Sequence, residues 1–365
     1  MMEAIKAPVR VCCFCEKWES GGIESFLTNI LSSMDRNGLS VDIVVSQRSE
    51  NVYEKTLCAL GIPLLVLSGN CRYTLKNLRL FRRLLRENRY DVVHLNIYQG
   101  LSLLFAWEAK RAGISIVIAH SHNTDLRPSA GRALKMVLHR FCSRLLTCCA
   151  TTLWAPSEAA ARFMFGAKAF ECIPNGIRPE RFIFSQAGRT AAREKLGVGD
   201  KFVIGGVGRL CWQKNQTFLL DVLARMDDAV LLLVGEGEDL DMLREKAGRM
   251  GLSGRVIFYG ATGDMPPLYW AMDALALPSR FEGLGIVAVE AQAAGLYTLC
   301  SENVPPEAAV TPLAEFAPLD PALWAEKLAA AGMTRADMSD AVRAAGYDVS
   351  TVSAHVRAAY MGGRT

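Results

Sequence analysis

Short apolar runs alternate with longer amphipathic segments along most of the chain. The runs at 9–15, 41–46, 91–96 and 114–120 are rich in β-branched residues and lack polar alternation, which is typical of parallel strands covered on both faces. The segment 23–34 that follows the first run carries apolar residues at helical spacing. Strands that alternate with helices in this way predict an α/β fold with doubly wound parallel sheets.

This strand–helix series occurs twice. A Gly/Pro turn at 172–182 and a polar stretch end the first series, and the second begins at 202–210. A chain of 365 residues is also too long for one ordinary core. We therefore expect two Rossmann-like domains that face each other across a cleft, over residues 1–185 and 186–345. A last helix at about 346–365 is a candidate to pack back on the first domain.

Composition narrows the class of protein. Hydrophobic residues make up 51% of the chain, yet no apolar stretch approaches the length of a membrane span. The N-terminus has no secretory pattern, and the cysteines number eleven, an odd count. These features favour a reducing cytoplasm with buried free thiols over a disulfide framework. The sequence CCFC at 12–15 lacks a second ligand pair at zinc spacing, so we expect no metal site.

Charge is distributed unevenly. Residues 1–185 carry a balance of +9 and the remainder −5, so the first half favours an anionic partner. One face of the predicted helix within 73–90, about 120° wide, carries five basic residues: Lys76, Arg79, Arg82, Arg83 and Arg86. Such a face is typical of docking on anionic lipid head groups. An ordinary solvated helix face remains the alternative, and nucleic acid is not indicated because no aromatic platform accompanies the charges.

Two glutamates flank a glycine-rich turn in RFEGLGIVAVEAQAAG at 280–295. Eight residues of helix rise about 12 Å, which is too far for Glu282 and Glu290 to act together on one glycosidic bond. Residues 283–286 lie between the first glutamate and the helix, where free N–H groups attract phosphate. The order carboxylate, anion cradle, carboxylate suits a sugar, a diphosphate and a ribose. The alternatives are a helix-entry charge at Glu282 and a solvated helix face at Glu290.

Two cations follow the first strand of the second series, in GVGRLCWQKN at 206–215. Arg209 and Lys214 lie in a post-strand loop, where two cations can hold a diphosphate without metal. Two unrelated surface charges are the alternative. The spacing G-x-G-x-x-G is absent here and at 235–240, which disfavours a dehydrogenase.

The first half offers its own candidates at strand ends. Gly21 and Gly22 precede the first helix and allow close approach of a ligand, although a plain turn would explain them too. His120 ends the run at 114–120 and His122 follows it, and both point to the same side if the chain stays extended. Both histidines are candidates at this point, and Asn175 is expected mainly to shape a loop, with direct ligand contact as the alternative.

Several of these segments together resemble a known family. GRLCWQKN, LLLVGEGEDL, CIPNGI and the long stretch VIFYGATGDMPPLYWAMDALALPSRFEGLGIVAVEAQAAG are similar to the family 4 glycosyltransferases of the GT-B fold. GGIESFL and IAHSHNT resemble the branch that builds bacterial capsular polysaccharides and exopolysaccharides. The resemblance covers nearly the whole chain, and these motifs in this order are strongly specific.

The resemblance implies a role for each candidate residue. Glu282 would contact the hydroxyls of the donor sugar, Glu290 the ribose, and Arg209 and Lys214 the diphosphate. A histidine would lie near the reacting sugar carbon, and in the alignment with the family we prefer His122 to His120 for this role. The first domain would then be the acceptor side, and the second would bind the nucleotide sugar. The remaining donor-binding positions are Gly21, Gly22, Gly208, Gly260, Gly283, Leu284, Gly285 and Ile286.

The expected activity is retaining, metal-independent transfer of a sugar from a nucleotide to an acceptor hydroxyl. The resemblance favours a UDP-sugar, with a GDP-sugar as the second choice, and no further cofactor. It implies a lipid-linked saccharide as acceptor and an enzyme at the inner face of the membrane. A UDP-sugar 2-epimerase of similar fold and a non-catalytic sugar-nucleotide binding protein are the alternatives.

Overall fold

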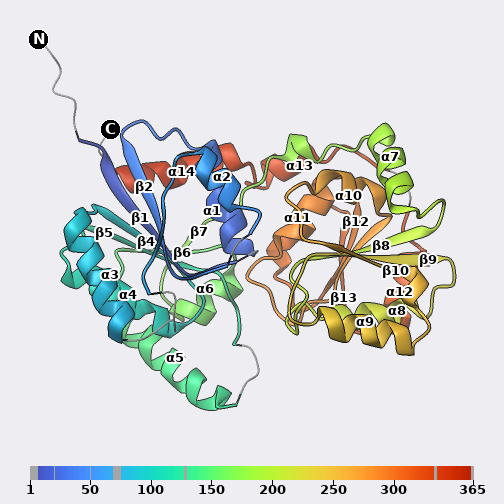
Figure 1. Cartoon of the computed structure of the whole chain (residues 1–365), viewed down its shortest axis with the longest axis horizontal. Coiled ribbons are helices and arrows are strands. Elements are labelled where there is room, and N and C mark those ends of the chain that lie inside the picture. The colour runs from blue at the N-terminus through green and yellow to red at the C-terminus, as the bar shows by residue number, and fades with distance from the viewer. Residues whose placement is uncertain are drawn as a thin grey trace, which may run out of the picture. The chain divides into compact units, whose positions relative to one another are not determined.

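The structure is a computed structural model that describes residues 7–19, 21–49, 51–68, 75–126, 130–332 and 335–362. The chain divides into two compact units, and both are α/β (Figure 1). Unit 1 comprises Met1–Gly176 and Val349–Thr365, and unit 2 comprises Ile177–Asp348. Every strand pairing within the two sheets is parallel. The predicted fold class is therefore confirmed.

Unit 1 is built on a seven-stranded sheet of order β3-β2-β1-β4-β5-β6-β7. Its strands are β1 (Val9–Trp18), β2 (Leu39–Arg48), β3 (Leu64–Val66), β4 (Val92–Ile97), β5 (Ile116–Ser121), β6 (Thr152–Ala155) and β7 (Glu171–Cys172). Its helices are α1 (Gly22–Ser33), α2 (Glu54–Ala59), α3 (Leu75–Asn88), α4 (Leu103–Arg111), α5 (Arg132–Leu146), α6 (Glu158–Phe165) and α14 (Val349–Met361), with short 3-10 turns at Gly100–Ser102 and Thr147–Cys149.

Helices cover both faces of this sheet, which explains why its strands are apolar without alternation. Cys13 and Cys15 of β1 pack in the core formed with α1 and α14. Cys12 and Phe14, on the opposite side of the strand, pack in the core formed with α3, α4 and α6. The cysteines of CCFC are thus buried core residues, and no disulfide joins the ten cysteines in the described parts of the chain.

Unit 2 has a six-stranded sheet of order β10-β9-β8-β11-β12-β13. Its strands are β8 (Phe202–Val207), β9 (Ala229–Val234), β10 (Val256–Gly260), β11 (Ala274–Leu277), β12 (Tyr297–Ser301) and β13 (Ala314–Ala317). Its helices are α7 (Gln186–Leu196), α8 (Gln216–Leu223), α9 (Leu240–Arg249), α10 (Pro266–Ala271), α11 (Ile286–Ala293), α12 (Pro321–Ala329) and α13 (Ser339–Ala344), with 3-10 turns at Pro179–Arg181, Ser253–Arg255 and Pro306–Ala308.

The chain passes between the units twice. It leaves unit 1 after Gly176 and returns at Val349. A Cβ added to Gly176 would lie 2.7 Å from the Cα of Val349, so close packing at the start of α14 requires a glycine there. The expected boundary at residue 185 is too late, because the crossing precedes that position. The last helix lies in unit 1, where α14 contacts α1 and β1.

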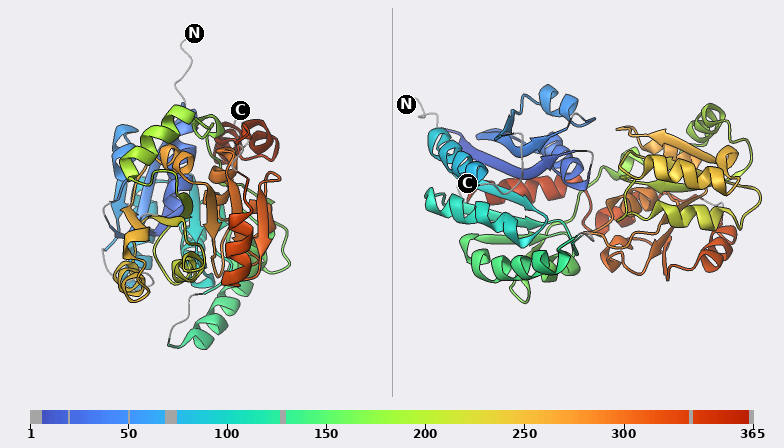
Figure 2. Two further views of the ribbon diagram at one scale, coloured as in Figure 1. Left: turned by 90° about the vertical axis from the view of Figure 1, so that its right-hand side faces the viewer. Right: turned by 60° about the horizontal axis from the view of Figure 1, so that its bottom comes forward.

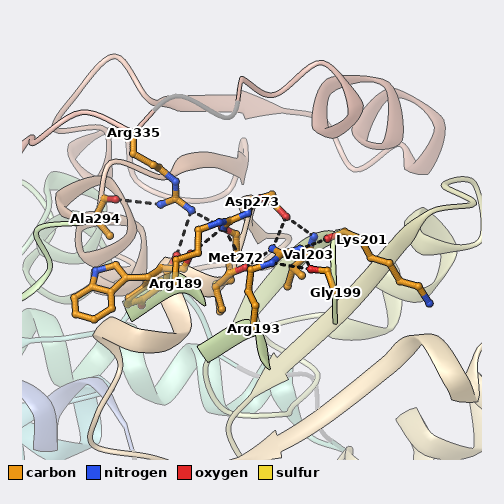
Figure 3. A network of polar contacts seen from close by, with 12 residues as sticks. Arg189, Arg193, Gly199, Lys201, Val203, Met272, Asp273, Ala294 and Arg335 are labelled. Atoms are coloured by element: carbon orange, nitrogen blue, oxygen red, sulfur yellow. Dashed lines mark hydrogen bonds and ion pairs between the residues drawn. The ribbon is translucent and has the colours of Figure 1, made fainter. Parts of the chain in front are cut away.

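A buried ionic network holds α7 to the body of unit 2 (Figure 3). Arg189 and Arg193 of α7 bind the two carboxylate oxygens of Asp273 at 2.6 and 3.1 Å. The backbone N–H of Val203 in β8 donates to the same carboxylate at 2.7 Å. Arg335 donates to the carbonyls of Met272 and Ala294 nearby. The polar stretch after residue 182 is therefore no loose linker but part of unit 2.

No helix in the described ranges is long and apolar enough to cross a bilayer.

The Asp273 network gives a stability prediction. Asp273→Ala leaves two largely buried guanidinium groups without their carboxylate, and breaking a buried pair of this kind costs about 3 kcal/mol. Native-state hydrogen exchange should show that loss for amides of β8 and α7. Asp241→Ala, which removes a fully exposed carboxylate on α9, is the control. Equal exchange in both variants would contradict the assigned role of the network.

Candidate functional site

The strand order of unit 2 reverses between β8 and β11, which are neighbours in the sheet although three helices and two strands separate them in sequence. Ligands of open parallel sheets bind beyond the carboxyl ends of the strands at such a switch point. The loop after β8 carries Arg209 and Lys214, and the loop after β11 carries Glu282. Three of the residues singled out from sequence therefore converge on one place.

An ion pair joins these two loops. Lys214 Nζ lies 2.6 Å from Glu282 Oε1, and the hydroxyl of Ser279 donates to the same oxygen at 2.6 Å. Glu282 is only 5% exposed, so the pair sits in an environment where an uncompensated charge would be costly. The sequence placed both residues at the site but did not predict that they pair, and it missed Ser279.

Further polar contacts fix the two loops against each other. Asn215 donates to the carbonyl of Pro278 at 3.1 Å, and Arg280 donates back to the amide oxygen of Asn215 at 2.9 Å. Asn215 has a φ of 57°, a left-handed conformation that asparagine tolerates better than most residues. The guanidinium of Arg280 also stacks over the ring of Trp212 at 4.8 Å. Sequence reasoning missed these loop-fixing residues.

Close backbone approach explains the glycines around the loop after β8. Gly208 has a φ of 130°, and a Cβ added there would lie 3.3 Å from Lys214 Cε. A Cβ on Gly235, after β9, would lie 2.1 Å from the carbonyl oxygen of Gly208. Gly260, at the end of β10, has a φ of 85° and accepts from the Gly235 N–H at 2.9 Å. These positions need glycine for the backbone path itself, and they bring three strand ends together.

Helix α11 begins directly beside Glu282. Gly285 precedes it with a φ of 88°, a conformation that glycine adopts without strain. Leu284 is buried and anchors the turn in the core of unit 2. The first N–H groups of a helix carry partial positive charge. The start of α11 follows β11, and Lys214 and Arg209 follow β8. The carboxyl ends of these two strands therefore carry positive groups that can bind an anion.

Glu290 lies one turn further along α11 and is half-buried. The hydroxyl of Tyr269 donates to its Oε2 at 2.7 Å. Burial raises the pKa of Glu290 to about 7, although Tyr269 and the positive charge of Arg181 act in the opposite direction. A carboxyl group with one oxygen engaged and a pKa near neutrality can accept hydrogen bonds from a ligand, and its ionisation responds to that ligand.

This shift gives a pH prediction. The folded pKa of Glu290 lies above its unfolded value, so ionisation costs stability as pH rises from about 4.5 to about 7. Glu290→Gln keeps an acceptor for Tyr269 without the charge. Without ligand, the variant should gain stability over wild type through that window, by up to roughly 3 kcal/mol. Thermal unfolding at a series of pH values measures the difference.

The matched control is Glu245→Gln, which replaces an exposed carboxylate on α9. It should follow wild type at every pH. A Glu290→Gln curve that runs parallel to wild type across the window would contradict the assigned pKa.

The histidines of unit 1 occupy different environments. His120 lies inside β5 and is fully buried, with its Nδ1 3.2 Å from His94 Nε2. His94 Nδ1 in turn lies 2.7 Å from the hydroxyl of Tyr360 on α14. Burial lowers the pKa of His94 to about 3 and that of His120 well below its usual value. The Nε2 of His120 is buried and finds no hydrogen-bond partner among the described residues.

His122 follows β5 and is half-buried, so it is more accessible than His120. Its Nε2 lies 2.9 Å from Asn96 Oδ1, and the Asn96 amide N–H₂ donates to the carbonyl of Phe14 at 3.3 Å. Because that bond fixes which Asn96 atom is the oxygen, His122 Nε2 must be the donor. Burial lowers the pKa of His122 to about 3, so the ring is neutral and carries a single proton. With that proton on Nε2, Nδ1 keeps its lone pair and can accept a hydrogen bond. Sequence reasoning missed Asn96, a polar residue near the end of a buried strand.

The other candidates of unit 1 are placed as follows. Gly21 precedes α1 in an extended conformation, and Gly22 opens the helix, where an added Cβ would meet nothing within 4 Å. Neither position requires glycine for its backbone conformation. Asn175 is buried, and its Oδ1 has no partner among the described residues. No group of three or more metal-ligating side chains occurs in the described ranges.

The predicted basic face belongs to α3 and is partly neutralised. Arg82 forms an ion pair with Glu108 of α4, and Arg83 pairs with Glu87 at 2.6 Å. Lys76, Arg79 and Arg86 are exposed. Leu78, Phe81 and Leu85 of α3 are buried in the unit 1 core, whereas Leu75 at the start of the helix is 70% exposed. This helix therefore offers solvent a charged face, with Leu75 as its one exposed large hydrophobic side chain.

Two sequence families match this chain. The family described as Glycosyl transferases group 1 matches residues 188–331, and Glycosyltransferase Family 4 matches residues 20–181. The putative glycosyltransferase EpsF of Bacillus subtilis is 30% identical over 351 residues, and the alignment covers 90% of this chain and 90% of EpsF. A GDP-mannose-dependent monoacylated alpha-(1-6)-phosphatidylinositol monomannoside mannosyltransferase of Corynebacterium glutamicum is 30% identical over 313 residues, 80% of this chain and 79% of that protein.

Solved structures share the fold. The Anabaena protein Alr3699/HepE, crystallised in complex with UDP and glucose, superposes with a TM-score of 0.79 at 22% identity. The match covers 96% of this chain and 98% of that one.

Proposed function

Because the chain belongs to the family 4 glycosyltransferases of the GT-B fold, we propose that it is a retaining, metal-independent enzyme. It transfers a sugar from a nucleoside diphosphate to an acceptor hydroxyl. The observation that carries the proposal is the Lys214–Glu282 pair at the switch point of unit 2. Arg209 lies in the loop after β8, as Lys214 does, and Glu290 lies on α11, which begins after the loop of Glu282.

Each group has a task in this proposal. The donor diphosphate replaces Glu282 as the ion-pair partner of Lys214, and it also contacts Arg209 and the start of α11. Released from Lys214, the Glu282 carboxylate accepts from hydroxyls of the donor sugar. Glu290 accepts from the ribose. The positive groups then stabilise the charge that develops on the departing diphosphate, so a bound cation is not needed for that task.

Retention follows from the way the acceptor enters. The acceptor oxygen attacks the anomeric carbon on the face that the diphosphate leaves, and the diphosphate oxygen takes the acceptor proton. The bond from carbon to the diphosphate oxygen breaks, and a glycosidic bond forms. His122 stays neutral at physiological pH, because its pKa is lowered to about 3. We assign it the role of accepting, through Nδ1, a hydrogen bond from a sugar hydroxyl.

For the donor nucleotide we favour UDP over GDP. The HepE complex contains UDP, whereas the Corynebacterium relative depends on GDP-mannose. The loop after β10, which includes Gly260, offers backbone groups to the base. For the acceptor we propose a lipid-linked saccharide of polysaccharide biosynthesis, presented at the cytoplasmic face of a membrane. The acceptor of the Corynebacterium protein is named as a phosphatidylinositol mannoside, which supports this class.

Loss of a diphosphate-binding cation should show in turnover. Arg209→Ala removes one charge-stabilising group and should lower kcat at least roughly tenfold. The fold should persist, since Arg209 is only half-buried. Release of UDP from the donor in the presence of acceptor, measured at saturating substrates, gives kcat. Wild-type turnover in this variant would remove Arg209 from the mechanism.

Arg249→Ala is the matched control, because Arg249 is exposed on α9 in the same unit. Lys214→Ala should also lower kcat at least roughly tenfold. That variant removes the cation that contacts the buried Glu282 carboxylate at Oε1, so Lys214→Arg is needed beside it. Partial recovery of turnover in Lys214→Arg separates loss of charge from loss of fold.

A further inference from the structure

The outward face of α5 is apolar. Five large hydrophobic side chains are exposed along it: Leu134 at 64%, Val137 at 62%, Leu138 at 39%, Phe141 at 60% and Leu145 at 51%. Their spacing of three and four residues places them on one stripe about 100° wide. The stripe, which we call the α5 stripe, extends over about 16 Å of helix. Neighbouring exposed hydrophobics of this number are unusual on a protein surface.

The α5 stripe is not needed to hold the helix on its unit. His139 on the opposite side is buried and accepts at Nδ1 from the Gly100 N–H at 2.8 Å. Its Nε2 donates to the carbonyl of Phe163 at 2.9 Å, and its ring stacks on that of Phe163. Cys142 is buried on the same side. The helix is therefore anchored by one face while a second apolar face points outward.

Positive charge flanks the stripe. At 100° per residue, Arg140 and Arg144 follow the edge of the stripe that Val137 forms, and both are exposed. Residues 132–146 contain no aspartate or glutamate. No carboxylate in the described part of the chain pairs with Arg140 or Arg144. The partner that covers the stripe is therefore expected to be both apolar and anionic.

The neighbouring helices α4 and α3 also expose aromatic or basic side chains. Helix α4 contacts both α3 and α5, and α5 lies at the margin of unit 1 (Figure 1 and the left view of Figure 2). Trp107 of α4 is 38% exposed, and the guanidinium of Arg111 lies 4.6 Å from its ring centre. A tryptophan beside basic residues is favourable where apolar and polar media meet. The exposed cations of α3 lie on the other side of α4.

We propose that α5 is the membrane-docking element of this protein and lies in the interface of an anionic lipid bilayer. The α5 stripe enters the acyl boundary, and Arg140 and Arg144 bind lipid phosphates. Docking is thus hydrophobic as well as electrostatic. The exposed cations of α3 contribute only a longer-range electrostatic attraction to the anionic bilayer. A second copy of the chain fits less well, because two α5 faces would bring like charges together. The proposal rests on the proposed function only in that a lipid-linked acceptor places the substrate at a membrane.

Vesicle co-sedimentation of the full chain tests the proposal. The probe is vesicles of phosphatidylglycerol and phosphatidylcholine, compared with phosphatidylcholine alone. Wild type should bind the anionic vesicles. Val137→Ser/Phe141→Ser removes two exposed side chains and should weaken that binding about tenfold or more. Wild type that stays in the supernatant, or a double variant that binds like wild type, would overturn the proposal.

Two controls sharpen the result. Met242→Ser changes an exposed hydrophobic residue on α9 of unit 2 and should leave vesicle binding unchanged. Arg79→Ser/Arg86→Ser on α3 should weaken binding less than Arg140→Ser/Arg144→Ser on α5. The reverse order would move the docking surface to α3 and overturn the assignment.

Sedimentation velocity and nucleotide binding separate the remaining outcomes. A wild-type dimer that Val137→Ser/Phe141→Ser converts to monomer would assign the stripe to self-association and overturn the proposal. Thermal shift with UDP and GDP, in the same preparations, reports on the donor site alone. Vesicle binding without any nucleotide response would contradict the proposed function while leaving the docking helix in place.

Discussion

The site of unit 2 depends on one ion pair, that of Lys214 with Glu282. It ties the loop after β8 to the loop after β11, at the point where the strand order reverses. Each charge satisfies the other while no ligand is bound, which a buried carboxylate requires. A nucleoside diphosphate sugar can replace both halves, since its phosphates attract the lysine and its hydroxyls donate to the glutamate. Lys214 and Glu282 would therefore each have a polar partner both before and after the donor binds.

The alternation of apolar strands and helices was enough to predict two doubly wound units. It was not enough to place the border between them, because α7 looks like a polar linker in sequence. What assigns α7 to unit 2 is the contact of Arg189 and Arg193 with Asp273, about eighty residues away. Such long-range pairs leave no local pattern. The exposed apolar face of α5 could not be predicted for a similar reason. Periodicity shows that α5 has apolar residues, but only the packing of the folded chain shows which of them stay exposed.

At the candidate site, sequence reasoning located the charged residues but not their partners. Lys214 and Glu282 lie in loops that follow strands, and Glu290 lies one turn into the helix that begins after Glu282. Charged residues at such places can be recognised in sequence. Tyr269 and Asn96, which orient Glu290 and His122, lie within segments that look like core. A polar residue near the carboxyl end of a buried strand is the signal that could have indicated Asn96. No local signal distinguishes Tyr269 from a packing aromatic.

Hydrogen exchange of the full chain, with and without saturating UDP or GDP, tests the central claim most directly. If the donor nucleotide binds at the carboxyl ends of β8 and β11, exchange should slow in the peptides that cover 206–215 and 279–290. Unchanged exchange in both peptides with either nucleotide would contradict the account. Protection confined to unit 1 would contradict it as well, because the diphosphate would then be held by groups other than Arg209, Lys214 and the start of α11.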